Sequence, residues 1–271
     1  MVINAQSIAA DLALIREKKP LIHCVTNFVT MNWVANGLLS LGASPIMAHA
    51  IEEVSDLVHI SNALVLNIGT LEARWINSMK TALDAALECH IPVILDPVGA
   101  GATRFRTHTA HDLLAQGGVS VVKGNASEVC ALAGEKLTTR GVDSSLTPDE
   151  ALRAAEKLEH EFGCVVVISG KQDIVIAAGS QLRVYNGTPM MTRVTGMGCL
   201  VSALMGAFCA VQDDPFIAAA HTMATCGIVG EIALTNANGP GSYSVSFLDF
   251  LSHVNQSSIA QYLTVESHAQ S

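Results

Sequence analysis

Apolar and polar positions follow one another in blocks along most of this chain. Short runs that are apolar throughout are separated by longer stretches with helical periodicity, and uninterrupted apolar runs are typical of strands buried on both faces of a parallel sheet. We expect strands at Leu21–Thr26, Ser44–Met47, Ala63–Ile68, Val93–Asp96, Val119–Lys123 and Cys164–Ser169. We expect helices at Thr30–Leu41, Ile51–Ile60, Leu71–Cys89, Thr107–Gln116 and Pro148–Phe162.

The pattern changes after Gly170. Two strand-like runs, Asp173–Ala178 and Gln181–Asn186, are separated by Gly179-Ser180, which predicts a hairpin. Three helical stretches follow, at Gly198–Val211, at Pro215–Leu234 and from Phe247 onward. The first two are apolar on more than one face, so we expect them inside the protein or in a subunit interface. No linker divides the chain, and we expect one domain over residues 1–271.

Alternating strands and helices predict an α/β fold with a mostly parallel central sheet and helices on both faces. Open parallel sheets bind ligands beyond the carboxyl ends of their strands. The polar and small residues that end the predicted strands should therefore meet in one crevice. They are Asn27, Met47, Gly69, Thr70, Asp96, Lys123, Gly124, Asn125, Ser169 and Gly170.

The amino-acid composition argues against several classes of function. Half of the residues are hydrophobic and 14% are charged, so the core is expected to be large and part of the surface covered by other subunits. The formal net charge of −9 argues against a nucleic-acid partner and against an anionic membrane surface. Mean hydropathy is +0.39, but every apolar run ends before the roughly 20 residues that span a bilayer. Residues 1–19 lack the features of a secretory signal, so we expect a cytoplasmic protein.

The seven cysteines and ten histidines have no metal-ligand spacing. Without a C-x-x-C pair, neither a zinc site nor a disulfide framework is predicted. Most of the cysteines are expected to behave as small buried hydrophobic residues. Cys199 differs because it lies at the start of a helix.

Gly196-Met197-Gly198-Cys199 leads into a long apolar helix. Such a turn directs unpaired backbone N–H groups and the positive end of a helix dipole at one point, which suits a phosphate. A helix start also lowers the pKa of a thiol, so Cys199 is expected to ionise in part and to act as a weak base. A tight turn into a helix is the alternative interpretation. The dinucleotide fingerprint is excluded because Val201 stands where its third glycine would be.

Three further positions have both a structural and a functional interpretation. Asp96 either caps the turn after its strand or helps to hold Mg²⁺, which needs only one or two carboxylates. Asn125 and Glu128 fit a helix cap with its capping box, yet Lys123 could also direct a positive charge at phosphate and Glu128 could lie beside the metal. Asn27 either caps the next helix or is a buried amide that faces a heteroaromatic ligand.

Taken together, these segments resemble the 4-methyl-5-(2-hydroxyethyl)thiazole kinases of thiamine salvage, a family of the ribokinase-like superfamily. The segments occur in family order from about residue 15 to about residue 255. Most ribokinase-like sugar kinases have Asp where this chain has Cys199, so the Gly-x-Gly-Cys ending is specific. The matching segments are His23–Asn32, Ser44–Ala48, Leu66–Leu71, Leu95–Thr103, Lys123–Glu128 and Val194–Cys199.

The resemblance implies a three-layer ribokinase-like fold. It also implies an enzyme that uses ATP and Mg²⁺ to phosphorylate the primary hydroxyl of the thiazole. It also implies a homotrimer whose thiazole pockets lie at subunit boundaries. Lys123 and Ser169 stand where many relatives have Arg and Thr, and a lysine is a point charge rather than a two-pronged donor. The implied sites are Cys199 for catalysis; Met47, Gly196, Asn27, Val29, Gly69 and Thr70 for the thiazole alcohol; Lys123, Ser169 and Gly198 for ATP; and Asp96 and Glu128 for the metal.

Two other functions are also compatible with the sequence. One is another ribokinase-like enzyme, such as a hydroxymethylpyrimidine kinase or an ATP-dependent nucleotide-repair dehydratase. The segment around Asn27, together with Cys199, favours the thiazole alcohol instead. The other is a non-catalytic ligand-binding or regulatory protein that has kept the fold. The joint presence of five residues argues against it: Asp96, Glu128, Gly196, Gly198 and Cys199.

Overall fold

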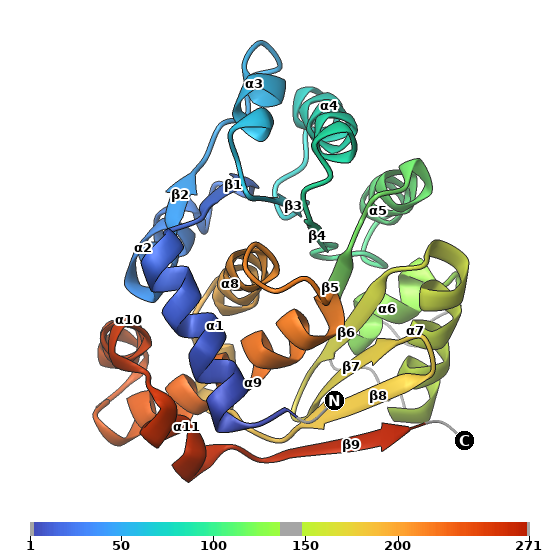
Figure 1. Ribbon diagram of the computed structural model, residues 1–271. Coiled ribbons are helices and arrows are strands. Elements are labelled where there is room, and N and C mark those ends of the chain that lie inside the picture. The colour runs from blue at the N-terminus through green and yellow to red at the C-terminus, as the bar shows by residue number, and fades with distance from the viewer. Residues whose placement is uncertain (1–2, 136–147, 270–271) are drawn as a thin grey trace.

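A computed structural model describes residues 3–135 and 148–269, and a nine-stranded sheet runs through this part of the chain (Figure 1). The strand order is β2-β1-β3-β4-β5-β6-β7-β8-β9. Neighbours from β2 to β6 pair in parallel, whereas β7, β8 and β9 are antiparallel. The strands are β1 (Leu21–Val25), β2 (Ser44–Ile46), β3 (Ala63–Asn67), β4 (Val93–Asp96), β5 (Val121–Asn125), β6 (Val165–Ser169), β7 (Asp173–Ala177), β8 (Ser180–Val184) and β9 (Val265–Ala269).

Helices cover both faces of the sheet, and a hydrophobic cluster lies on each side (Figure 1). The predicted α/β fold with a mostly parallel sheet is therefore confirmed. One layer holds α1 (Ala5–Lys18), α2 (Met31–Leu41), α8 (Met197–Cys209), α9 (Pro215–Thr235), α10 (Pro240–His253) and α11 (Gln256–Tyr262). The other holds α3 (Val54–His59), α4 (Ala73–Cys89), α5 (Arg104–Gln116), α6 (Ala126–Leu132) and α7 (Pro148–Phe162).

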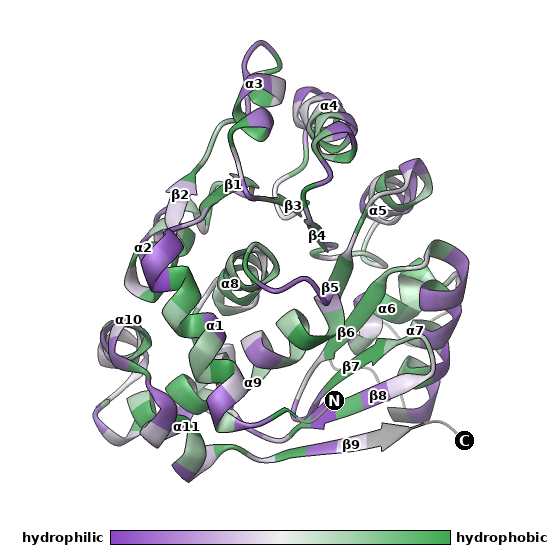
Figure 2. Ribbon diagram, viewed as in Figure 1, coloured by the Kyte–Doolittle hydropathy of each residue, from purple (hydrophilic) through white to green (hydrophobic). Residues whose placement is uncertain are grey.

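Strand β3 illustrates how the sequence produces the layers. Successive side chains of a strand point to opposite faces, so Val65 packs on the α8 side while Leu64 and Leu66 pack on the α4 side. A Cβ at Gly206 would lie 2.9 Å from Val65 Cγ2, so this glycine lets α8 approach the sheet closely. Figure 2 shows the central strands in green, as expected for strands that are buried on both faces.

Helices α8 and α9 confirm the two apolar helices expected within the protein. The α9 helix is long and apolar enough to cross a membrane, but 83% of its most apolar window is buried. It packs between the sheet, α8 and α10. Its apolar character is therefore explained by its position in the core.

The differences from the predicted elements lie mainly near the ends of the chain. The helix expected from Phe247 begins at Pro240, because proline fits the first helical position and Ser242 caps the helix start. The predicted stretch from Phe247 onward is divided into α10 and α11, and helix α1 and strand β9 lie outside the predicted elements. The hairpin after Gly170 is confirmed as β7 and β8, with Ala178 and Gly179 in the left-handed conformation of its turn.

Candidate functional site

Four sequence-predicted residues meet where the parallel strands end. Asn27 follows β1, Asp96 ends β4 and Lys123 lies in β5. The first turn of α8, which packs against β1, β3 and β4, brings Cys199 to the same place. The strand order therefore joins segments that are up to 172 residues apart in the sequence.

A chain of buried hydrogen bonds joins three of the strand ends. Asn27 Nδ2 donates to Asn67 Oδ1 at 2.9 Å, and Asn67 Nδ2 donates to Asp96 Oδ2 at 2.8 Å. Ser202 Oγ, from α8, donates to the same Asp96 oxygen at 2.8 Å. Burial raises the pKa of Asp96, while the charge of Lys123 and these two donors oppose the rise. Asn67 has no assigned role in the sequence prediction, yet it is the centre of this chain.

The Cys199 thiol lies at the end of this chain. Asn27 Nδ2 donates to Cys199 Sγ at 3.4 Å. Burial raises the pKa of Cys199 above its usual value, and the negative charge of Asp96 raises it further. Lys123, Asn67 and Asn27 oppose this rise without cancelling it, so the surroundings of Cys199 favour the protonated thiol over the partly ionised thiol expected at a helix start.

The turn before Cys199 has the geometry of an anion site. Gly196 has φ of +82°, and a Cβ there would lie 2.4 Å from Thr30 Cγ2, so the position requires glycine. Within residues 3–135 and 148–269, no acceptor receives the N–H of Gly198 or Cys199. Lys123 Nζ donates to Gly198 O at 3.0 Å, which brings a positive charge to the same turn. Free amides beside an ammonium group can bind a phosphate.

The end of β6 lies next to Lys123. Ser169 Oγ donates to Gly124 O at 3.3 Å, which ties β6 to β5. Gly170 N donates to Asp173 Oδ1 at 2.9 Å. Desolvation raises the pKa of Asp173 to about 7, against the opposing effects of the Gly170 N–H and of Lys123. Sequence reasoning missed Asp173 because it looked like the first residue of an ordinary hairpin strand.

Glu128 has the structural role that its spacing from Asn125 predicts. Asn125 N donates to Glu128 Oε2 at 2.8 Å, and Glu128 N donates to Asn125 Oδ1 at 3.0 Å, so the capping box is confirmed. The other carboxylate oxygen accepts from Gly99 N at 2.9 Å. Burial raises the pKa of Glu128, and the nearby charge of Asp96 raises it further. Each of the two acids therefore lies within electrostatic reach of the other.

The predicted thiazole-side residues are only partly joined by contacts. A Cβ at Gly69 would lie 2.8 Å from Asn27 Nδ2, and Thr70 Oγ1 accepts from Phe28 N at 3.2 Å. Val29 is 67% exposed, and Met47 is half-buried against the α8-side cluster. The expectation that Asn27 caps the next helix is wrong, because Thr30 is the N-cap of α2 and the Asn27 amide is buried in the hydrogen-bond chain.

Sequence reasoning also missed Arg106, on α5. Its Nη1 donates to Ile68 O at 2.9 Å and to Val98 O at 2.8 Å, and its Nη2 donates to Gly69 O at 2.8 Å. Arg106 thereby holds together the loops that follow β3 and β4. An arginine in the first turn of a helix gives no sequence signal for this role.

The acids of the site fit Mg²⁺ better than a metal held by protein ligands alone. In the described part of the chain, no group of three or more His, Cys, Asp or Glu side chains could hold a metal ion. Asp96 offers Oδ1, since the hydrogen bonds from Asn67 and Ser202 both end on Oδ2, and Glu128 lies close enough to interact with its charge. Mg²⁺ keeps several waters and combines one or two carboxylates with phosphate oxygens.

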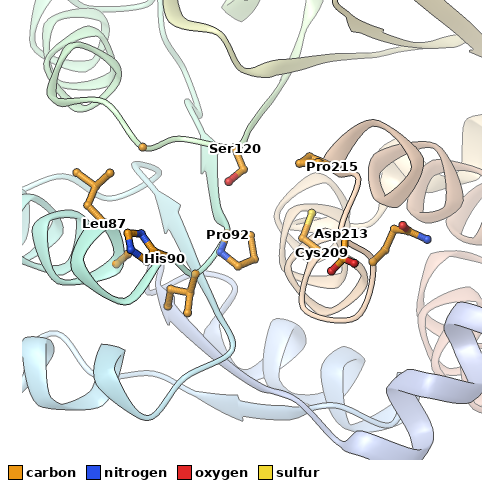
Figure 3. A pocket seen from close by; sticks show the side chains of 11 residues that line it. Leu87, His90, Pro92, Ser120, Cys209, Asp213 and Pro215 are labelled. Atoms are coloured by element: carbon orange, nitrogen blue, oxygen red, sulfur yellow. The ribbon is translucent and has the colours of Figure 1, made fainter.

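A separate cavity of about 360 Å³ lies near the amino ends of β4 and β5, whereas the candidate site lies at the carboxyl ends of the parallel strands (Figure 3). Pro92, Ser120, Cys209 and Asp213 are among the residues that line it. Cys209 is the last residue of α8, whereas Cys199 is in its first turn. None of the sequence-predicted site residues lines this cavity.

Comparisons with known proteins point to one family and one fold. The Hydroxyethylthiazole kinase family matches residues 12–257. A protein of Syntrophus aciditrophicus named hydroxyethylthiazole kinase is 47% identical over 266 residues, which cover 98% of each chain. The solved hydroxyethylthiazole kinase protein of Pyrococcus horikoshii has a TM-score of 0.90 at 42% identity, covering 97% of this chain and 99% of the other. A ribokinase-like superfamily protein of Enterococcus faecalis has a TM-score of 0.60 at 14% identity, covering 87% of both chains, which shows the fold alone.

Proposed function

The chain belongs to the hydroxyethylthiazole kinase family, and from this membership we propose how its site works. The protein transfers the γ-phosphoryl group of ATP to the primary hydroxyl of 4-methyl-5-(2-hydroxyethyl)thiazole, a step of thiamine salvage. The observation that carries our account of the site is the turn at Gly198 and Cys199. It offers free N–H groups beside Lys123 and lies one hydrogen bond from the chain that ends at Asp96.

The thiazole alcohol lies on the Asn27 side of this turn. Asn27 Nδ2 is engaged by Asn67 and Cys199, which leaves Asn27 Oδ1 available to the alcohol. Burial and Asp96 raise the pKa of Cys199, which favours a thiol that orients the hydroxyl oxygen over a thiolate that removes its proton. Phosphoryl transfer through a loose transition state depends mainly on such positioning. The remaining residues assigned to this pocket are Met47, Val29, Gly69, Thr70 and Gly196.

ATP lies on the Lys123 side of the same turn. The N–H groups of Gly198 and Cys199 and the ammonium group of Lys123 stabilise the negative charge on the transferred group. Ser169 lies at the end of the neighbouring strand, at a position suited to the rest of the nucleotide. Lys123 donates as a point charge, so it holds phosphate without the two-pronged geometry of an arginine.

Asp96 and Glu128 would hold Mg²⁺ beside the phosphates, where it would neutralise charge on the phosphate oxygens. Asp96 presents Oδ1 to this position because Asn67 and Ser202 hold its other oxygen. Glu128 is held by the N–H groups of Gly99 and Asn125, so its place depends on two loops of the site.

The exposed apolar residues of the N-terminal part support a subunit boundary, and the resemblance to the family implies that the assembly is a homotrimer. Phe28 is 64% exposed, Val29 67% and Leu39 60%, and the first two follow Asn27 directly. Contact with a neighbouring copy would cover these side chains and complete the thiazole pocket at the subunit boundary. The substrates are small soluble molecules, and we place the enzyme in the cytoplasm as one ribokinase-like domain over its whole length.

The test is ADP release in the presence of the thiazole alcohol and Mg-ATP. We expect one ADP for each phosphorylated thiazole, with the product identified by mass spectrometry. The matched control is 4,5-dimethylthiazole, which lacks the hydroxyl and should release no ADP above the background without acceptor. Hydroxymethylpyrimidine and pyridoxal should have lower kcat/KM. Faster ADP release with either of these alcohols, or a rate independent of any acceptor, would refute the assignment.

A further inference from the structure

Asn67 uses both polar atoms of its side-chain amide within the site, although its place in the family-matching segment Leu66–Leu71 implies no role for it. It is 1% exposed at the end of β3. Its Oδ1 accepts from Asn27 Nδ2 at 2.9 Å and from Gly69 N at 3.0 Å. Its Nδ2 donates to Asp96 Oδ2 at 2.8 Å.

The backbone fixes which way this amide points. The N–H of Gly69 can only donate, so it requires the oxygen of Asn67 on its side. The nitrogen of Asn67 then faces Asp96 Oδ2, which accepts a hydrogen bond from it. Reversing the Asn67 amide would set a nitrogen against two donors and an oxygen against a carboxylate.

The orientation of Asn67 in turn fixes Asn27. Because Asn67 presents oxygen, Asn27 must present its nitrogen, which also reaches Cys199 Sγ at 3.4 Å. The oxygen of Asn27 is therefore turned away from Asn67. Gly69 leaves the space for this arrangement, since a Cβ there would lie 2.9 Å from Asn27 Cγ.

We propose that Asn67 is a positioning residue that sets the direction of the Asn27–Asn67–Asp96 chain and so aligns the acceptor alcohol with the metal-side carboxylate. This inference rests on the proposed function of the site. Asn67 acts on the alcohol through Asn27 and on the phosphate side through Asp96. It touches neither the alcohol nor the nucleotide itself.

A thermodynamic cycle tests the action through Asn27. The dissociation constant of the thiazole alcohol is measured by calorimetry for the parent, Asn67→Ala, Asn27→Ala and the double variant. Asn67→Ala should weaken alcohol binding about fivefold, the factor for one hydrogen bond of ordinary strength. In the Asn27→Ala background it should have no further effect. An equal loss in both backgrounds, or none in either, would overturn the proposal.

The Asn67→Asp variant separates the effect of Asn67 on Asn27 from its effect on Asp96, the two ends of the hydrogen-bond chain. The aspartate keeps an acceptor for Gly69 and Asn27 but sets a second carboxylate oxygen against Asp96 Oδ2. The KM of the alcohol should stay within about twofold of the parent, while kcat falls at least tenfold because Asp96 loses one of its two donors and is repelled by the new carboxylate. A parallel change in KM and kcat, or none in either, would contradict the proposal. This variant also carries the test if Asn67→Ala does not fold.

Two controls isolate this effect. Asn62→Asp makes the same change just before β3, at its other end, where Asn62 Oδ1 accepts from Leu21 N at 2.8 Å and the acceptor is retained. Its KM and kcat should match the parent. Ser202→Ala removes the other donor to Asp96 Oδ2 and should lower kcat without weakening alcohol binding.

If the parent itself produced no phosphorylated thiazole, the proposed function would fail, whereas an active parent with unaffected Asn67 variants would refute this inference alone.

Discussion

At the scale of single residues, burial decides the chemistry of the site. Cys199 lies at a helix start beside Lys123, and both features favour a thiolate, yet desolvation and Asp96 raise its pKa. Asp96 is nearly inaccessible, and its burial likewise raises its pKa. Neither effect could be read from the sequence, because both depend on which strands and helices meet around these side chains.

We predict that Cys199→Ala slows turnover, but by a smaller factor than is expected when a general base is removed. Removing a base costs about 10²–10⁴-fold in rate, whereas the loss of an orienting thiol should cost less than about 10²-fold. The shape of the pH profile of kcat should be unchanged between pH 6 and 8, because the raised pKa keeps the parent thiol protonated there. If the Cys199→Ala variant lost one limb of that pH profile, Cys199 would be the general base after all.

We predict that Asp96→Asn stabilises the ligand-free protein while impairing activity. An acid whose pKa is raised on folding contributes stability at low pH that is lost as the pH rises through its folded pKa. The variant should therefore melt at a higher temperature than the parent at pH 8, by about 2–4 °C for each kcal/mol gained, with a smaller gain at pH 5. The Mg²⁺ concentration for half-maximal activity should rise. A lower melting temperature at pH 8 or an unchanged Mg²⁺ titration would contradict this.

At the scale of elements, the start of α8 depends on one close approach. Gly196 takes a left-handed conformation, and Thr30 of the α2 N-cap lies against its Cα. This contact fixes the direction in which the free N–H groups of the first turn point. The anion site thus depends on how α2 and α8 meet, as well as on the helix dipole.

We predict that Gly196→Ala destabilises the protein by more than about 1–2 kcal/mol, the cost of a left-handed residue alone, because its Cβ also meets Thr30 Cγ2. Gly163→Ala is the matched control, since Gly163 has φ of +65° and nothing within 4 Å of a Cβ. Adding Thr30→Ser, which removes Cγ2, should recover the difference. Denaturant unfolding measures all four proteins, and equal losses for the two alanine variants would disprove the contact.

Most of the sheet could be predicted from the sequence because its strands are apolar throughout. Strand β4 has the predicted bounds, and β5 differs because its last residues, Gly124 and Asn125, pair with β6 despite being polar or small. Strand β9 was missed since its hydrogen bonds to β8, rather than an apolar pattern, define it. Helix α1 did carry a signal, with Asn4 and Ser7 in a capping box before Ile8. The site positions followed from strand ends, but the role of Asn67 required the tertiary contacts.

At the scale of the whole molecule, apolar surface lies next to the site. Phe28 packs on Trp75 with ring centroids 4.4 Å apart, and it remains 64% exposed. Val29, beside it, is one of the residues assigned to the thiazole pocket. A subunit boundary at this place would explain both the exposure and the incomplete contacts among the thiazole-side residues.

We predict a particle of about three times the chain mass of 28.4 kDa by light scattering. Val29→Asp should shift the mass toward a single chain and raise the KM for the thiazole alcohol, because it places a charge in an apolar boundary. Val245→Asp is the control, since Val245 is 61% exposed on α10 and its change should leave mass and KM unaltered. A parent that scatters as a single chain would contradict the trimer.

The central claim is that phosphate and alcohol meet at the turn before Leu200. A crystal structure with the thiazole alcohol, Mg²⁺ and a non-hydrolysable ATP analogue tests it most directly. The account predicts the γ-phosphate within hydrogen-bonding distance of the Gly198 and Cys199 N–H groups, and the alcohol oxygen between that phosphate and the Cys199 thiol. Ligands bound elsewhere, for example in the cavity beside Cys209 and Asp213, would contradict it.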